Sequence, residues 1–347
     1  MKYTLRSVCF FTLMLLLGTK NSIAQNNNLD IHFQGYGFFD NREYRAFEDR
    51  SHTFSGARAE VDLGVNLDSV NHFRFGANGI HEFGAGPFFG KVDPVIYYNF
   101  SGKKGWQFFV GAFPREGLIS DYPLALLNDT LQYYRPNIQG LLTSYESPWG
   151  KETIWIDWVS RQTATDREQF IFGASGKYLP NPYGPFFLSH YFLLLHDAGA
   201  AILLPNDHIN DNGGGQVRVG LDFSHKTSLD SLNISAGGMI SLERTRGIDG
   251  FQIPKGFVAE IFLQKRHFGL RDNFYAGKGS NIVYGDSFYS KKRYNRLDLI
   301  YTPFIYNQIR GSFILSFHQT PGNLGDSQQA FRLTYDIGRK NLVRFKD

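Results

Sequence analysis

The sequence has one cysteine, few charged residues and almost no long apolar run. Its 347 residues are 20% charged, and the mean hydropathy is −0.29. That value argues against a bundle of membrane helices, because each helix needs about 20 consecutive apolar residues. Glycine and aromatic residues are abundant instead, with 37 Gly, 33 Phe and 19 Tyr. Such a composition suits short alternating strands better than long apolar helices.

The first residues have the pattern of an export signal. Lys2 and Arg6 precede a run of ten apolar residues, and small residues up to Ala24 provide a cleavage site. We expect residues 1–24 to be a signal peptide that is removed near Ala24. The single cysteine, Cys9, leaves with it, so the mature chain has no disulfide or thiolate chemistry. Removing three basic residues lowers the formal charge from +4 to +1, which suggests no nucleic-acid partner.

The rest of the chain alternates with period two. From 57 to 67 (ARAEVDLGVNL) every odd position is Ala, Val or Leu, whereas the even positions include Arg58, Glu60 and Asp62. Successive side chains of a strand point to opposite faces, so this segment is a strand with one apolar and one charged face. A soluble β-sandwich also alternates in this way, and it stays open as an alternative at this point.

Strand length and connection length favour a barrel that spans a membrane. We predict about 16 strands, with 14 to 18 tolerated, within a single domain over 25–347. Short turns alternate with long loops between them, which is the plan of an outer-membrane barrel. Hydrocarbon cannot satisfy a free strand edge, so the antiparallel sheet must close. The existence of the strand at 267–276 is doubtful, because Asp272 and Phe274 share one face. The predicted strands are 29–40, 53–67, 71–84, 92–101, 105–113, 139–147, 152–161, 168–179, 186–196, 214–225, 231–244, 255–266, 267–276, 293–303, 308–319 and 328–339.

The longest predicted connection, 114–138, has more leucine than an exposed loop needs, and long ordered loops are usually functional. With its strand plan and the VGAFPR turn at 110–115, the chain resembles the general porins. It looks most like porin-like outer-membrane proteins of the Bacteroidetes type. The resemblance covers the whole mature chain and rests on topology. It implies a third extracellular loop that folds into the lumen. The chain departs from the usual porins at its end, VRFKD, which lacks a terminal aromatic residue.

The resemblance also implies which charges line the pore. The constriction residues on the loop would be Arg115, Glu116, Asp121, Asp129 and Arg135. The side chains that alternation places on the pore wall include Arg58, Glu60, Asp62, Arg74, Arg218, Asp222, Arg310 and Arg332. The whole predicted lumen face carries eight basic and nine acidic groups, a balance that indicates weak charge selectivity.

The sequence therefore predicts an outer-membrane channel for passive diffusion of small hydrophilic solutes, and not an enzyme. The alternative is a non-conducting barrel that binds, anchors or assembles other molecules. The expected partners are outer-membrane lipid and lipopolysaccharide, with a homotrimer compatible and no nucleic acid.

Enzymatic and metal chemistry find little support in the sequence. Ser316 and His318 share a strand face, as a nucleophile and its base would. Both are assigned to the lumen, however, where a lipid substrate has no access. The histidines show no paired metal spacing, and no Walker, Rossmann or HExxH motif occurs, so we predict no cofactor and no metal.

Overall fold

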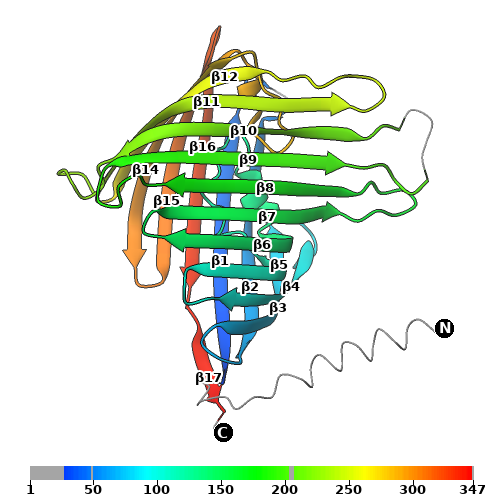
Figure 1. Ribbon diagram of the computed structural model, residues 1–347, viewed down its shortest axis with the longest axis vertical. Coiled ribbons are helices and arrows are strands. Elements are labelled where there is room, and N and C mark those ends of the chain that lie inside the picture. The colour runs from blue at the N-terminus through cyan, green and yellow to red at the C-terminus, as the bar shows by residue number, and fades with distance from the viewer. Residues whose placement is uncertain (1–26, 48–49, 203–206, 346–347) are drawn as a thin grey trace.

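The computed structural model describes residues 27–47, 50–202 and 207–345. Consecutive strands pair antiparallel up to β16 (Asn323–Asp336), which pairs with β1 (Asn28–Glu43), so that the sheet closes on itself (Figure 1). The predicted all-β, 16-strand antiparallel barrel is thus confirmed, with one additional strand. The predicted signal peptide and its cleavage site lie outside the described residues.

Each predicted strand exists, with ends that differ by a few residues. The strand that was doubtful is β13, where Asp272 faces outward and accepts a hydrogen bond from Asn295 Nδ2 at 2.7 Å. The remaining elements are β2 (His52–Asn66), β3 (Asn71–Glu82), β4 (Lys91–Ser101), β5 (Trp106–Pro114), α2 (Thr130–Tyr134), β6 (Asn137–Ser147), β7 (Gly150–Ser160), β8 (Gln169–Tyr178), β9 (Phe186–Asp197), β10 (Asn210–Asp222), β11 (Ser231–Thr245), β12 (Lys255–Lys265), β13 (Phe268–Gly277), η2 (Ser287–Ser290), β14 (Arg293–Tyr306), β15 (Ile309–Thr320) and β17 (Lys340–Arg344).

Two details near the end of the chain differ from the prediction. The long loop expected at 320–327 is wrong, because Thr320 already pairs with Asn323 in a tight hairpin. Pro321 and Gly322, with φ of +82° at the glycine, provide the residues that a type II turn requires. The additional strand β17 pairs with the first residues of β1 at one tip of the molecule (Figure 1).

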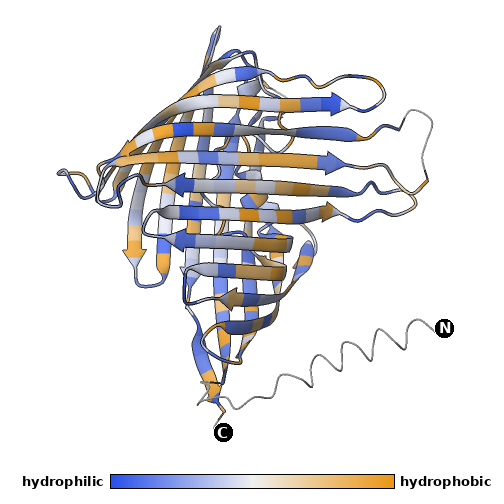
Figure 2. Cartoon of the chain, in the orientation of Figure 1, coloured by the Kyte–Doolittle hydropathy of each residue, from blue (hydrophilic) through white to orange (hydrophobic). Residues whose placement is uncertain are grey.

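The burial of the strands is inverted relative to a soluble protein. Val61 and Val219 are 44% and 63% exposed, whereas the neighbouring Glu60 and Arg218 are 3% and 7% exposed. Apolar and polar residues alternate along the strands (Figure 2). The apolar face therefore points outward and the polar face inward, an arrangement that a sandwich core in water does not produce but a bilayer requires. Within the described residues, no helix is long and apolar enough to cross a membrane.

We expect an arginine at Val217 to hinder folding of the barrel. This side chain points outward near the middle of β10 and is 55% exposed. A charge at the bilayer midplane costs roughly 2–4 kcal/mol on a barrel's lipid face. Heat-modifiable gel migration and urea unfolding of Val217→Arg in lipid vesicles would measure this loss, with Val217→Leu as the matched control. Equal stability of the two variants would contradict the assignment of this face to lipid.

Candidate functional site

The connection between β5 and β6 is tied to the inward face of the wall. Arg115 Nη2 donates to Asp157 Oδ2 on β7 at 2.6 Å, and both side chains are at most 5% exposed. Trp155 Nε1, also on β7, donates to Tyr122 Oη at 3.0 Å, and Tyr122 donates in turn to Phe192 O on β9. These contacts join segment 115–136 to β7 and β9.

A second set of contacts ties the same segment to strands elsewhere in the sheet. Asp129 precedes α2 and accepts from Arg332 Nη2 on β16 at 2.8 Å. Burial alone would raise the pKa of Asp129, but Arg332, Arg296 and Arg42 lower it to about 2. Within α2, the Tyr133 ring stacks on Phe38 of β1 with centroids 4.6 Å apart.

The long connection between β13 and β14 packs against this segment. Asp286 N donates to Leu124 O at 2.8 Å, and Asn128 N donates to Tyr284 O at 2.7 Å. Apolar residues of both connections, such as Leu126 and Phe288, are fully buried in one cluster with inward-facing wall residues. Burial raises the pKa of Asp286, and Arg296 opposes that shift. A continuous apolar core thus lies on the inward side of the sheet.

The structure gathers some of the predicted pore charges around one polar cavity of about 370 Å³. Glu116 accepts a hydrogen bond from Gln34 Nε2 at 3.1 Å. Arg58 Nη1 donates to Gln132 O, and Arg218 Nη1 donates to Glu260 Oε2 at 3.1 Å. The predicted residues that line this cavity are Arg58, Arg115, Glu116, Asp121, Asp129, Arg218 and Arg332.

The other predicted residues lie outside the lining of this cavity. Arg135 donates to Val159 O at 3.0 Å, and Asp222 pairs with Lys177 at 3.3 Å. Arg310 is exposed beside the turn between β14 and β15. Asp62 and Arg74 lie near the start of β1, whereas Glu60 is opposite Gln34, the residue that donates to Glu116.

Ser316 and His318 do not form a nucleophile–base pair. Ser316 Oγ accepts from Arg296 Nη2 at 3.2 Å, whereas His318 Nδ1 lies 2.7 Å from Tyr294 Oη. Both side chains are at most 1% exposed, so a substrate cannot reach them.

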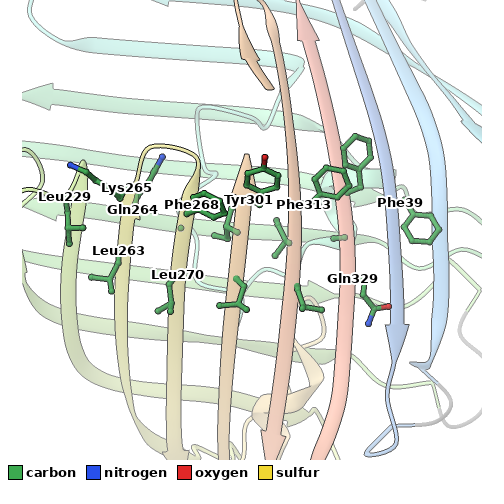
Figure 3. A pocket seen from close by; sticks show the side chains of 17 residues that line it. Phe39, Leu229, Leu263, Gln264, Lys265, Phe268, Leu270, Tyr301, Phe313 and Gln329 are labelled. Atoms are coloured by element: carbon green, nitrogen blue, oxygen red, sulfur yellow. The ribbon is translucent and has the colours of Figure 1, made fainter. Parts of the chain in front are cut away.

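The outer wall carries an apolar groove of about 760 Å³ across β12 to β16 and β1 (Figure 3). Most of its side chains point away from the barrel interior, and several are large and exposed: Phe268 is 65%, Phe313 47% and Phe39 45% exposed. A concave apolar surface of this size suits hydrocarbon chains.

Polar side chains on β1, β2 and β16 form a hydrogen-bonded network where this groove ends. Asn41 Nδ2 donates to Gln329 Oε1 at 2.8 Å and to Glu43 Oε1 at 3.1 Å. Thr53 Oγ1 donates to Asn41 Oδ1 at 2.7 Å, and Gln329 Nε2 donates to Ser327 Oγ at 2.9 Å. The strand register places these side chains on the same outward face as Phe39, and Gln329 also lines the groove. We call these five residues the outer polar network. None of these residues was among the predicted site residues, which were placed on the pore wall and on loop 114–138.

Solved outer-membrane proteins share this fold. Pseudomonas aeruginosa OpdL matches with a TM-score of 0.54 and 13% identity, over 91% of this chain and 99% of that chain. The outer-membrane protein OmpT of Vibrio cholerae, in its trimer form, matches with a TM-score of 0.57 and 8% identity, over 90% and 99% of the two chains. Salmonella typhi OmpF in complex with daunomycin matches with a TM-score of 0.53 and 10% identity, over 90% of this chain and 98% of that chain. These likenesses support a porin-like barrel, and the Bacteroidetes type stays a prediction.

No curated protein matches the chain. Residues 21–342, however, match the family described as lipid A 3'-O-deacylase-type, which is a family of enzymes. The prediction that the protein is not an enzyme is therefore wrong. That prediction rested on one Ser–His pair on the inward face and did not include the outward polar positions of β1, β2 and β16. Because the match spans nearly the entire sequence, the chain belongs to the lipid A 3'-O-deacylase-type family.

Proposed function

We propose that the protein is an outer-membrane hydrolase that removes an ester-linked acyl chain from the 3' position of lipid A. Its family supplies the reaction, and the porin-like fold supports the location. The observation that carries the proposal is the outer polar network, which faces outward at the end of the apolar groove.

A lipid with a polar headgroup matches this combination of surfaces. Polar side chains that face hydrocarbon are costly unless they find hydrogen-bond partners, so they mark functional sites. Sugar hydroxyls and amides of a lipid headgroup would bond to Asn41, Glu43 and Gln329. The acyl chains would then lie along Phe39 and Phe313 in the groove, where they bury apolar surface.

Glu43 is the group in the network best suited to act as a general base. It is exposed, and it lies directly opposite Ser327 on the neighbouring strand. We infer that its carboxylate takes a proton from a water molecule that attacks the ester carbonyl. The tetrahedral intermediate then collapses, and the departing sugar oxygen takes the proton from Glu43. The products are a free fatty acid and a sugar hydroxyl.

Glu43→Gln tests this role. We expect vesicles with the wild-type protein and purified lipid A to yield lipid A lacking one acyl chain, detected by mass spectrometry. The variant should lose 10²-fold or more of the rate, as expected for removal of a general base. Asp272→Asn, at an outward carboxylate outside the network, is the matched control and should retain full activity. Equal rates for Glu43→Gln and the control would contradict the assignment.

Passage of small hydrophilic solutes is a second candidate function, favoured by the polar cavity beside segment 115–136. The segment would narrow the lumen, with Arg115, Glu116, Asp121, Asp129 and Arg135 as constriction charges. The remaining predicted wall charges would give weak selectivity. A homotrimer is compatible with the trimer form of the Vibrio cholerae neighbour.

Asp129 offers a pH test of whether the segment closes the lumen. Its pKa in the folded protein is about 2, below the ordinary value of 3.8, so its ion pair stabilises the attachment above pH 4. That contribution, about 2 kcal/mol, is lost as the pH falls toward 2. In planar bilayers we expect Asp129→Asn to conduct more than the wild type at pH 7, and the difference to shrink toward pH 2. Identical conductance at both pH values would contradict closure through this contact.

A further inference from the structure

A histidine and two carboxylates converge on the inward face near the start of β1, away from the outer polar network. His32 on β1 is directly opposite Asp62 on β2, and Glu60 is the next inward residue along β2. One ligand atom from each of the three residues lies within 4.8 Å of the others. Sequence spacing alone could not reveal this group, because the register of two strands brings it together.

His32 lies between two carboxylates. Its Nε2 is 2.8 Å from Asp336 Oδ1, and its Nδ1 is 3.1 Å from Asp62 Oδ2. If Nε2 carries the proton and donates to Asp336, then Nδ1 points its lone pair at the Asp62 carboxylate. Two acceptors at this distance repel each other unless a cation lies between them, either a second proton on the imidazole or a metal ion. A metal-bound histidine characteristically donates its other ring N–H to a carboxylate, which is the role that Asp336 can fill.

Glu60 supplies an independent sign of a missing partner. The residue is 3% exposed, and its Oε2 accepts from Asn78 Nδ2 at 2.8 Å. Its Oε1 is buried and has no hydrogen-bond partner in the described part of the chain. A buried carboxylate oxygen without a donor is costly, and a bound cation satisfies it.

The charge around the three residues also leaves room for a cation. Arg339 Nη1 donates to Asp62 Oδ1 at 2.8 Å and to Asp30 Oδ1 at 2.9 Å. Arg58, the next inward residue beside Glu60 along β2, lies over the Tyr36 ring. With neutral His32, four carboxylates face three guanidinium groups, an excess of one negative charge: Asp30, Glu60, Asp62 and Asp336 against Arg58, Arg74 and Arg339.

We propose that His32, Glu60 and Asp62 bind a divalent transition-metal ion, with Asp336 orienting the imidazole. Imidazole and carboxylate ligands together suit ions such as Mn²⁺ and Zn²⁺. One carboxylate oxygen of Glu60 can join as the third ligand, because the three ligand atoms lie within 4.8 Å of one another. The site is separate from the outer polar network and does not depend on the proposed deacylation.

Manganese binding to the full-length mature barrel, folded in detergent and treated with EDTA, tests the proposal. The electron paramagnetic resonance signal of free Mn²⁺ disappears on binding, which gives the stoichiometry and affinity. We expect one ion per chain, displaced by Zn²⁺, and an affinity at least 10-fold lower in His32→Gln and in Glu60→Gln. His190→Gln is the matched control, because His190 also pairs with a carboxylate, Glu152, at 3.1 Å and should bind like the wild type.

A second measurement needs no variant. Diethylpyrocarbonate modifies free imidazole, and peptide mass spectrometry identifies which histidine is modified. We expect bound Mn²⁺ to slow the modification of His32 about 10-fold. The modification rate of His190 should stay unchanged. The proposal is overturned if wild-type and His32→Gln proteins of native gel migration bind Mn²⁺ equally. It is also overturned if Mn²⁺ leaves the modification rate of His32 unchanged, in which case a proton alone bridges His32 and Asp62.

Discussion

The pairing of β16 with β1 is the constraint on which the rest of the structure depends. It runs from Gln34 opposite Asp336 to Glu43 opposite Ser327 and leaves neither strand with a free edge. In hydrocarbon this closure is obligatory, because no water is present to satisfy an unpaired backbone. Closure also brings β1 and β16, which are far apart in the sequence, side by side. Residues of β1 and β16 thereby become neighbours on the outward face, in the outer polar network, and on the inward face, where Asp336 meets His32.

The two faces of the closed sheet have different roles in this account. On the inward side, segment 115–136 and the connection between β13 and β14 pack an apolar core onto the wall, held by pairs such as Arg115–Asp157. On the outward side, large apolar side chains form a groove that ends at Asn41 and Gln329. A lipid substrate reaches the second face directly from the bilayer. A porin-like barrel can therefore belong to a family of lipid deacylases without bringing lipid into its lumen.

Sequence alone predicted the strands well, because alternation between apolar and polar residues is a local property that closure in a membrane enforces. It failed at Thr320–Asn323, where one Pro–Gly turn replaces a longer loop, and at β17, which is too short to show a period. The metal ligands were missed because His32 and Glu60 are distant in sequence and meet only through strand register. The outer polar network could have been found in the sequence. Asn41 and Glu43 follow Phe39 at alternate positions of β1, so polar side chains occupy the outward face there. Polar strand residues were predicted only to face the lumen, so this signal was not used.

The central claim is that lipid A binds at the groove and the outer polar network of the outer wall. Photo-crosslinking tests it most directly, with benzoyl-phenylalanine placed at Phe39 in the groove, at Val217 on a distant outward strand, and at Tyr36 on the inward face. The account predicts a lipopolysaccharide adduct at position 39 that exceeds the adduct at 217 several-fold, with none at 36. Equal adducts at 39 and 217 would mean that the groove contacts lipopolysaccharide only as general bilayer lipid, and would contradict the claim.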